Sequence, residues 1–527
     1  VEPYGYASSS AIVSNTKKPL ATTLHILKSG ENRYIGEVRE VNGNYVYELE
    51  VVWAEAECFI DNYFNVNTNI GHKFYESLQD ALEDVADNDN DTFETRQANI
   101  MLLDKVSAES DTTKYHYIED TVNIGSRKVV MDIYNKSSKN IALRRQTNAT
   151  SIVVGENGLF AIRNTTDNLL FNIEGEGKSG DVFVKVEGGA FEIIGRIEVT
   201  NFYNTISSKG SLVWAVGGSV TLDGASVSGN MLSGSNGSLF GGVICAEGGC
   251  SVSISNGEFK NNSVVGNFSD ENYSTYGGAV AVLSKSTLTI DNVKFLQNVS
   301  RVGSFGQSFG GAIYASGSEV SYYSYYVTGI DNYGNPQQGE NDISFRENSA
   351  MFGGAMAVVG GLDGTTLVKG SLKLNGFVDE AASKTWTVIM YHNYSDVEGE
   401  SGNDIYAVDA NVDVTAMTSL CEVASGNGAG IFAGNNTDVN IKKSIFNTTY
   451  AQNGSAIYFR GNSLTMSDSV FTQNVATSGE IIDGDGGAIY VEGTNSQTAT
   501  VVLTSVIISY TWAKRGGAIY VGENVNF

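Results

Sequence analysis

Residues 251–262 read SVSISNGEFKNN and residues 287–298 read TLTIDNVKFLQN, and the two stretches align without a gap. In each, two apolar residues two positions apart are followed, five positions later, by a phenylalanine. A spacing of two is strand periodicity, because successive side chains of a strand point to opposite faces. The polar residues after the second apolar position break the strand, and the odd spacing of five restarts a strand that faces the same core.

The pattern recurs over residues 219–230, 438–449, 463–474 and 500–511. An asparagine follows the last apolar position by three residues at Asn230, Asn262, Asn298 and Asn474, and a further F-x-x-N runs from Phe345 to Asn348. A second motif, GGA with an aliphatic residue after it, alternates with the first. It begins at Gly277, Gly310, Gly353, Gly486 and Gly516, and weaker versions begin at Gly241, Gly428 and Gly454.

Both motifs favour a coil of stacked turns. A glycine pair permits a sharp corner with positive φ, and the small alanine after it lets neighbouring turns approach closely. One unit cannot bury its own inward residues, but stacked units pair every strand with the turn before and the turn after. Inward aliphatic and aromatic residues then form ladders, and corner asparagines can bond along the axis. The sequence therefore predicts an all-β fold, a right-handed parallel β-helix (β-solenoid).

This alternation of GGA-[ILVM] with F-x-x-N resembles the repeats of the polymorphic outer membrane protein family over roughly residues 213–527. The resemblance implies a pectin-lyase-like right-handed parallel β-helix that is exported to the cell surface and has adhesive roles. Some copies depart from the family pattern, since threonine stands in the final position of FNTT at Phe446.

The chain ahead of the repeats differs in pattern. Residues 73–87, KFYESLQDALEDVAD, place Phe74, Leu78, Leu82 and Val85 on one face of a helix. Such a helix suits the open end of a solenoid, which otherwise exposes apolar side chains and strand edges. The expected order is an N-terminal β appendage of antiparallel hairpins (1–70), a helical cap with entry strands (71–125) and the β-helix (126–527), interrupted by insertions at 319–342 and 376–400. The alternative for residues 1–70 is a segment that adds to a neighbouring subunit.

Composition excludes several classes of protein. The chain has 527 residues, 33 basic and 59 acidic side chains, and a net charge of −26, which argues against nucleic acid and acidic membranes as partners. It has 60 glycines and only 3 prolines, as uninterrupted strands joined by tight turns require. We expect no membrane span, because no window of 18 apolar residues occurs. The first residues lack a signal-peptide pattern, which suggests a processed chain or a fragment.

Aromatic residues in the two insertions are candidates for binding, since exposed rings can stack on sugars or form a contact patch. They are Tyr322, Tyr323, Tyr325, Tyr326, Trp386, Tyr391 and Tyr394. The alternative is that these side chains merely cover the flank of the solenoid.

Thirteen N-x-[ST] sequons are candidate N-glycosylation sites in a eukaryotic or archaeal source, although the Asn- and Ser/Thr-rich composition gives many by chance. They begin at Asn90, Asn135, Asn148, Asn164, Asn236, Asn261, Asn267, Asn272, Asn298, Asn393, Asn435, Asn447 and Asn453. Cys245 and Cys250 flank a turn and form a candidate disulfide, whereas Cys58 and Cys421 suit isolated thiols.

Catalytic residues are harder to find. Asp483 and Asp485 form the best acidic cluster, but they stand at a GG corner, no second acidic pair follows on the next turn, and the arginines do not cluster with them. The four histidines show no zinc-binding spacing. We therefore expect no catalytic residue, no metal and no cofactor.

Three functions compete. The first is a non-catalytic extracellular or cell-surface protein, an adhesin or coat component that binds surfaces or glycans. The second is a structural subunit of an extracellular filament in which copies of the chain stack end to end, because the chain stops one strand past a GGA corner without a capping helix. The third is a polysaccharide lyase or hydrolase.

Overall fold

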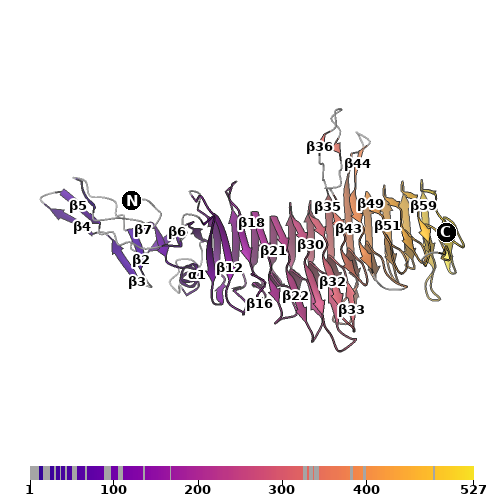
Figure 1. Ribbon diagram of the computed structural model, residues 1–527, viewed down its shortest axis with the longest axis horizontal. Helices are drawn as coiled ribbons and strands as arrows, with labels where there is room; N and C mark the ends of the chain where they lie inside the picture. Colours follow the sequence, from indigo (N-terminus) through magenta and orange to yellow (C-terminus); the bar gives the residue numbers. More distant parts are fainter. Residues whose placement is uncertain are drawn as a thin grey trace. The chain divides into compact units, whose positions relative to one another are not determined.

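The computed structural model consists almost entirely of β-strands (Figure 1). It describes residues 11–15, 24–28, 31–35, 37–41, 44–49, 56–65, 68–87, 97–104, 111–134, 137–166, 168–324, 329–330, 336–337, 343–379, 384–395, 399–478 and 481–527. The chain divides into unit 1, which comprises Val1–Glu176 and Phe183–Thr200, and unit 2, which comprises Gly177–Val182 and Asn201–Phe527. Among the described residues, no helix is long and apolar enough to span a bilayer.

Antiparallel strands open unit 1. β1 Ala11–Asn15 and β4 Glu37–Val41 both pair antiparallel with β5 Asn44–Leu49, and β2 Leu24–Lys28 pairs antiparallel with β3 Glu31–Ile35. These pairings confirm the antiparallel β appendage that the sequence predicts.

The capping helix is confirmed but begins later than its periodicity indicates. α1 Leu78–Asp87 follows the N-cap Ser77, whose hydroxyl accepts an N–H of the first helical turn at 3.1 Å. Phe74 lies instead in β7 Thr68–Tyr75, which pairs antiparallel with β6 Cys58–Asn65. Strand pairing therefore overrides helical periodicity before Ser77. The buried face of the helix consists of Leu78, Gln79, Ala81, Leu82 and Val85.

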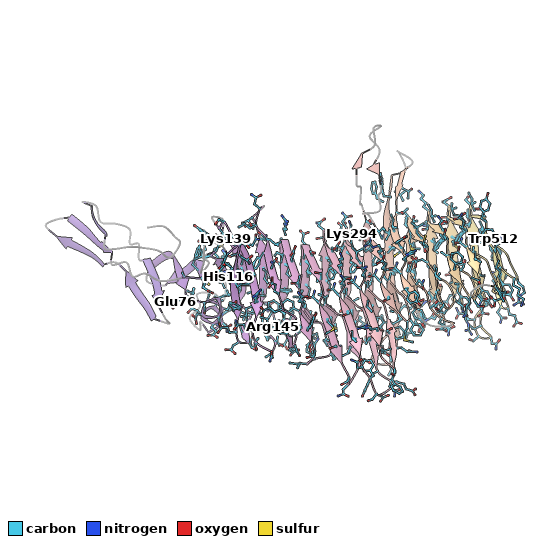
Figure 2. All side chains as sticks on the ribbon, in the orientation of Figure 1. Glu76, His116, Lys139, Arg145, Lys294 and Trp512 are labelled. Atoms are coloured by element: carbon cyan, nitrogen blue, oxygen red, sulfur yellow. The ribbon has the colours of Figure 1, made fainter. Side chains whose placement is uncertain are left out.

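Parallel strands form the remainder of unit 1. One stack runs in register through β8 Gln97–Leu102, β11 Lys128–Ile133, β14 Leu159–Asn164 and β18 Ala190–Thr200. A second stack joins β9 Thr113–Ile118, β12 Asn140–Arg145, β15 Phe171–Glu174 and β18. His116 and Arg145, labelled in Figure 2, are polar side chains of the second stack that are buried in this unit. The ring nitrogen Nε2 of His116 lies 3.0 Å from the carbonyl oxygen of Leu103.

Unit 2 is a coil in which one complete turn, a rung, consists of several short strands. In one rung these are β30 Thr287–Asp291, β31 Lys294–Leu296, β32 Val299–Val302, β33 Gln307–Phe309 and β34 Ile313–Ser316. Each pairs parallel with the equivalent strands of neighbouring rungs, as β30 does with β25 Ser251–Ser255 and β35 Glu319–Ser324. The right-handed parallel β-helix is thereby confirmed.

Phenylalanines of the F-x-x-N motifs form a ladder inside the coil. Phe259 and Phe295 stack with their ring centroids 5.3 Å apart, and Phe295 and Phe345 stack at 5.1 Å. Phe446 and Phe471 stack at 4.8 Å. All five are fully buried, which makes this ladder a large apolar contribution to the core.

Asparagines of the same motifs form a second ladder, the asparagine ladder, which consists of Asn230, Asn262, Asn298, Asn348 and Asn393. The side-chain amide of each of the first four donates to the Oδ1 of the next asparagine at 2.9–3.0 Å, and that Oδ1 also accepts the backbone N–H of the donating residue. All five residues are buried, so each bond satisfies a polar group that water does not reach. The predicted bonding of asparagines along the axis is confirmed.

The two glycines of a GGA corner serve different purposes. Gly310 has φ +62, a left-handed conformation that favours glycine. A Cβ on Gly311 would instead lie 2.0 Å from the carbonyl oxygen of Gly354 on the next rung. The second glycine is therefore required by the close approach of neighbouring rungs.

Three strands of the coil lie outside the aligned twelve-residue repeats. β35, β43 Gly370–Asp379 and β48 Ala410–Thr415 pair in register with β30 and with each other. The first six residues of the predicted 319–342 insertion are therefore a strand of the coil. Within 376–400, β43 continues into an antiparallel hairpin with β44 Lys384–Trp386. The remaining domain boundaries stay predictions.

Candidate functional site

The outer face of one sheet in unit 2 carries a row of side chains in register across successive rungs, here called the outer row. Its members are Trp214, Cys245, Ala281, Tyr314, Ala357, Tyr406, Phe432, Tyr458, Tyr490 and Tyr520. Their strands are β20 Val213–Val216, β24 Ile244–Glu247, β29 Val280–Leu283, β34, β40 Met356–Val359, β47 Ile405–Val408, β50 Ile431–Ala433, β54 Ile457–Phe459, β58 Ile489–Val491 and β61 Ile519–Val521.

At positions where the outer row has a small side chain, an aromatic residue that stands just before the GG corner covers it. Phe240, Tyr276, Phe309 and Phe352 each stand directly before a GG pair, and they form the corner stack. Their consecutive ring centroids are 4.7, 5.4 and 4.7 Å apart. With Tyr314 and other outer-row residues they form an apolar cluster outside the coil, which is why β29 is buried on both faces.

Beyond Phe352 the residues before the corners are polar or small, and the outer row itself becomes aromatic. Phe432, Tyr458, Tyr490 and Tyr520 stack at 4.8–5.3 Å with nearly parallel planes. The hydroxyl groups of Tyr458 and Tyr490 donate to the Glu492 carboxylate at 2.6 and 2.9 Å. This part of the row is a continuous aromatic stack.

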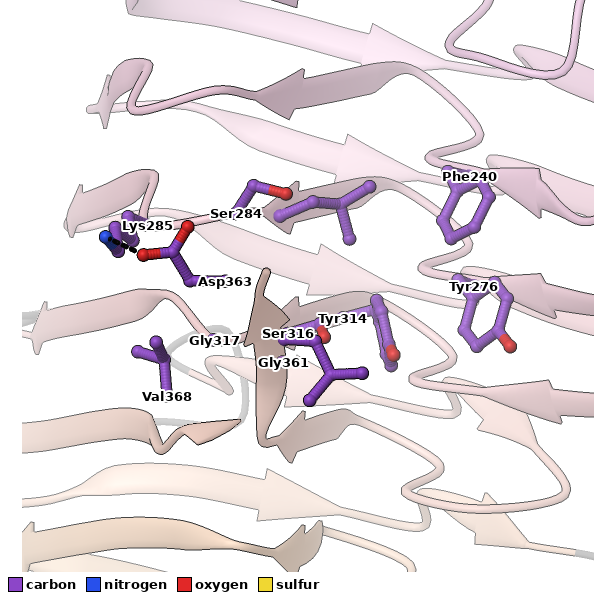
Figure 3. Close-up of a pocket in the computed structure, with 12 residues that line it drawn as sticks. Phe240, Tyr276, Ser284, Lys285, Tyr314, Ser316, Gly317, Gly361, Asp363 and Val368 are labelled. Atoms are coloured by element: carbon purple, nitrogen blue, oxygen red, sulfur yellow. Dashed lines mark hydrogen bonds and ion pairs between the residues drawn. The ribbon is translucent and has the colours of Figure 1, made fainter. Parts of the chain in front are cut away.

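A pocket of about 390 Å³ opens beside the corner stack (Figure 3). Hydroxyl-bearing Tyr276, Tyr314, Ser284 and Ser316 line it together with apolar side chains, which are those of Phe240, Leu283, Leu362 and Val368. Its volume lies within the range of pockets for small ligands.

One ion pair stands at this pocket. Lys285 Nζ lies 2.5 Å from Asp363 Oδ2, and both side chains are more than half exposed. Asp363 belongs to a hairpin of β41 Gly361–Asp363 and β42 Thr366–Val368, which brings Gly361 and Val368 to the same pocket. An exposed pair of this kind opens at little cost, so its charges are available to a ligand.

The backbone around Lys285 holds this geometry. Ser284 and Lys285 have φ +54 and +64, and their N–H groups donate to the carbonyl oxygens of Ser316 and Gly317 on the next rung. Burial raises the pKa of Tyr314 well above its usual range, so its hydroxyl stays protonated. The pocket thus presents neutral hydroxyl groups, one cation and one anion.

The seven aromatic residues predicted to bind a ligand differ in how exposed they are. Tyr322 is fully buried in the coil, where its hydroxyl donates to the Val293 carbonyl oxygen at 2.6 Å, so its prediction as a surface aromatic is wrong. Trp386 is also buried. Tyr323 and Tyr391 are half-buried, and Tyr394 is exposed. Tyr325 and Tyr326 lie outside the described residues, and none of the other five lines the pocket.

Sequons fall in different environments. Six asparagines are exposed: Asn148, Asn236, Asn261, Asn267, Asn272 and Asn435. Asn447 and Asn453 are half-buried, and Asn90 and Asn135 lie outside the described residues. Asn164, Asn298 and Asn393 are buried with bonded amides, so the folded coil leaves no room for a glycan on them. Glycosylation of the others stays a prediction.

The predicted Cys245–Cys250 disulfide is not formed. Cys245 lies in the outer row and packs in the apolar cluster under the corner stack. Cys250 lies outside that cluster, with its sulfur 4.0 Å from the Ser251 carbonyl oxygen. Burial raises the pKa of both thiols to about 12.

We expect the folded protein to have four reduced cysteines, of which only Cys421 reacts readily with a thiol reagent. Cys58, Cys245 and Cys250 are buried, and their raised pKa values leave almost no thiolate at neutral pH. Iodoacetamide labelling with mass spectrometry, before and after unfolding, checks this. A native mass lower by two hydrogens, with Cys245 and Cys250 unlabelled after unfolding, would contradict it.

The acidic cluster has a partner that the sequence did not reveal. Asp485 forms two hydrogen bonds with the Arg515 guanidinium of the next rung, at 2.8 and 2.5 Å, which corrects the prediction that no arginine clusters there. The exposed Asp483 instead accepts from Ser478. Each aspartate therefore has a structural partner of its own. No three His, Cys, Asp or Glu side chains gather in a metal-binding group among the described residues.

The rung that contains Asp485 also matches a known family of repeats. Residues 468–492 match the Chlamydia polymorphic membrane protein repeat. This match spans the F-x-x-N at Phe471 and the GGA at Gly486, so the resemblance seen in the sequence is confirmed for this polymorphic membrane protein repeat. No curated protein matches the chain. The catalytic unit of a thermostable GH87 alpha-1,3-glucanase from Streptomyces thermodiastaticus strain HF3-3 aligns at 11% identity and a TM-score of 0.22, covering 96% of this chain and 85% of that one.

Proposed function

We propose that the chain is a non-catalytic surface protein, an adhesin or coat component, that binds an uncharged saccharide in the pocket beside the corner stack. The pocket is the observation that carries this proposal. The polymorphic membrane protein repeat supports a place at an outer membrane or cell surface.

Chemistry at the pocket favours a saccharide. Sugar hydroxyl groups both donate and accept hydrogen bonds, and the pocket offers serine and tyrosine hydroxyls besides the Lys285–Asp363 pair. The apolar face of a sugar ring matches Leu283 and Val368, which line the same pocket. Asp363 and the net charge of −26 both disfavour an anionic glycan.

Replacement of Lys285 by alanine is expected to weaken saccharide binding about tenfold, as loss of one charged hydrogen-bond partner does. A glycan array identifies the ligand, and titration calorimetry compares the two proteins. Lys285 is mostly exposed, so the variant should fold normally.

Lys373→Ala is the matched control, because Lys373 is exposed on another strand of unit 2 and does not line the pocket. Equal loss of binding in both variants would indicate a general charge effect. The proposal fails if the array detects no uncharged glycan, or if Lys285→Ala binds as tightly as the unchanged protein.

Two alternative functions stay predictions. A filament subunit would show ordered end-to-end stacking of copies of this chain in electron micrographs. A polysaccharide lyase or hydrolase would need a carboxyl group free to act, and Asp485 is held by Arg515.

A further inference from the structure

Two consecutive rungs of unit 2 depart from the repeat at four motif positions. Strand register places Asn403 and Asp404 where the preceding rung has Gly354 and Ala355 of its GGA corner. In the rung that follows this corner, Ser419 occupies the ladder position of a phenylalanine, since it pairs with Phe446 one rung further on. Glu422 occupies the asparagine position three residues further on.

These replacements meet inside the coil. Asp404, Ser419 and Glu422 are all completely buried. Ser419 Oγ donates to Asp404 Oδ2 at 2.5 Å, and Asn393 Nδ2 donates to Asp404 Oδ1 at 3.0 Å. Glu422 Oε1 accepts the Asn393 N–H at 3.3 Å, as the next asparagine would. Serine frees the volume of a phenyl ring, and the two carboxyl groups enter that space.

Both carboxyl groups accept a hydrogen bond from Asn393 and therefore share one buried space, where ionisation of both at once is unfavourable. No N–H or O–H of the described residues reaches Glu422 Oε2. The hydrogen bonds to the pair come from Asn393 and Ser419, both of which are neutral.

Within the described part of the chain, the titratable side chains close in sequence to Asp404 and Glu422 do not contact this pair. Glu400 accepts the Tyr406 hydroxyl, His392 is exposed and stacks on Tyr391, and Cys421 is only partly buried. No cation among the described residues compensates two buried negative charges.

We propose that Asp404 and Glu422 form a proton-holding pair that makes the contact between these two rungs the pH-responsive element of the solenoid. Two carboxylates buried together are unfavourable, so the folded chain retains protons that the unfolded chain releases. The replacements act together. Asp404 and Glu422 can be buried side by side only because Ser419 leaves the space of a phenylalanine side chain and donates a hydrogen bond to Asp404.

The sign of the effect follows from the pKa values. Burial raises the pKa of Asp404 to about 7 and that of Glu422 well above its ordinary value, whereas both groups titrate near 4 when unfolded. The stabilisation is complete below about pH 4 and decreases as pH rises toward 7 and above. Each retained proton raises the unfolding equilibrium constant about tenfold per pH unit in this interval.

Urea unfolding between pH 5 and pH 7 tests the proposal. The unchanged protein should lose stability with a slope of about two protons. Glu422→Gln, which keeps the shape and hydrogen bonds without the titration, should reduce that slope to one proton or less. Asp413→Asn is the matched control, since Asp413 is exposed on β48, and it should leave the slope unchanged. Equal slopes in the unchanged protein and in Glu422→Gln would overturn the proposal.

A second measurement does not depend on the stability of that variant. Infrared spectra of the unchanged protein at pH 7 should contain the carbonyl stretch of a protonated carboxyl group, and its absence would also overturn the proposal. A variant that restores the repeat, with Asn403→Gly, Asp404→Ala, Ser419→Phe and Glu422→Asn, should fold, lack this band and show no slope from the pair.

Discussion

Replacement of Asn298 by alanine is expected to lower the free energy of unfolding of unit 2 by about 3 kcal/mol. Asn298 lies at the centre of the asparagine ladder. Its Oδ1 accepts both the backbone N–H and the side-chain amide of Asn262, and its own amide donates to Asn348 and to the Phe259 carbonyl oxygen. Alanine leaves the buried N–H of Asn262 without this acceptor and opens a cavity beside the phenylalanine ladder.

The control for this prediction is Asn440→Ala. Asn440 lies on an outward position of β51 Asp438–Lys442, where its amide donates to Asp413 at 3.1 Å in an exposed bond. Loss of such a bond to solvent costs a few tenths of a kcal/mol, because water replaces the partner. Urea unfolding followed by circular dichroism compares the two variants. Similar midpoints would mean that the asparagine ladder contributes no more than surface polar contacts.

Gly311→Ala is expected to be at least as damaging, at about 3 kcal/mol or more, since overpacking in a rigid core displaces the backbone. The new methyl carbon would lie 2.0 Å from the Gly354 carbonyl oxygen and 2.4 Å from the Ser349 nitrogen, both on the next rung. Neither is a flexible side-chain end, so the rungs themselves must separate. We expect a lower thermal midpoint and poorer yield of folded protein.

Gly517→Ala is the control that separates the clash between rungs from the general effect of replacing glycine by alanine on the backbone and on the unfolded chain. Gly517 is also the second glycine of a GGA corner, but a Cβ there would have only the Thr511 carbonyl oxygen as a neighbour, at 4.0 Å. Gly517→Ala should therefore leave the midpoint nearly unchanged. If both variants are equally stable, or equally unstable, the close approach of rungs is not the reason for the glycine.

The fold could be predicted from the sequence because its signals repeat. A pattern that recurs with strand periodicity specifies which residues face inward, and parallel pairing then follows from stacking. The prediction for Tyr322 failed because it rested on one residue type, a run of tyrosines, and not on the repeated pattern. Tyr322 looked like one of a group of surface tyrosines, yet the segment E-V-S-Y of β35 matches the strand pattern S-V-S-I, with tyrosine at the isoleucine position.

The candidate site was less accessible to prediction. Its pocket combines Phe240 and Tyr276 with a hairpin that contains Asp363, and nothing in the motifs indicates that this hairpin lies over Lys285. Arg515 was missed because its partner Asp485 is one rung away, a separation that depends on loop length. The pair of Asp404 and Glu422 does leave a signal, since a GGA corner and the F-x-x-N motif that follows it both depart from their consensus.

The regular register of the outer row and inner ladders has an evolutionary consequence. Residues 447–471 make up 25 positions, and their removal would join Phe446 to Thr472. Because Phe446 and Phe471 are register partners, as are Phe432 and Tyr458 and then Tyr490, the shortened chain would present equivalent residues to each neighbouring rung. Recombination between repeats can therefore change the length of such a gene in whole rungs without disturbing the packing on either side.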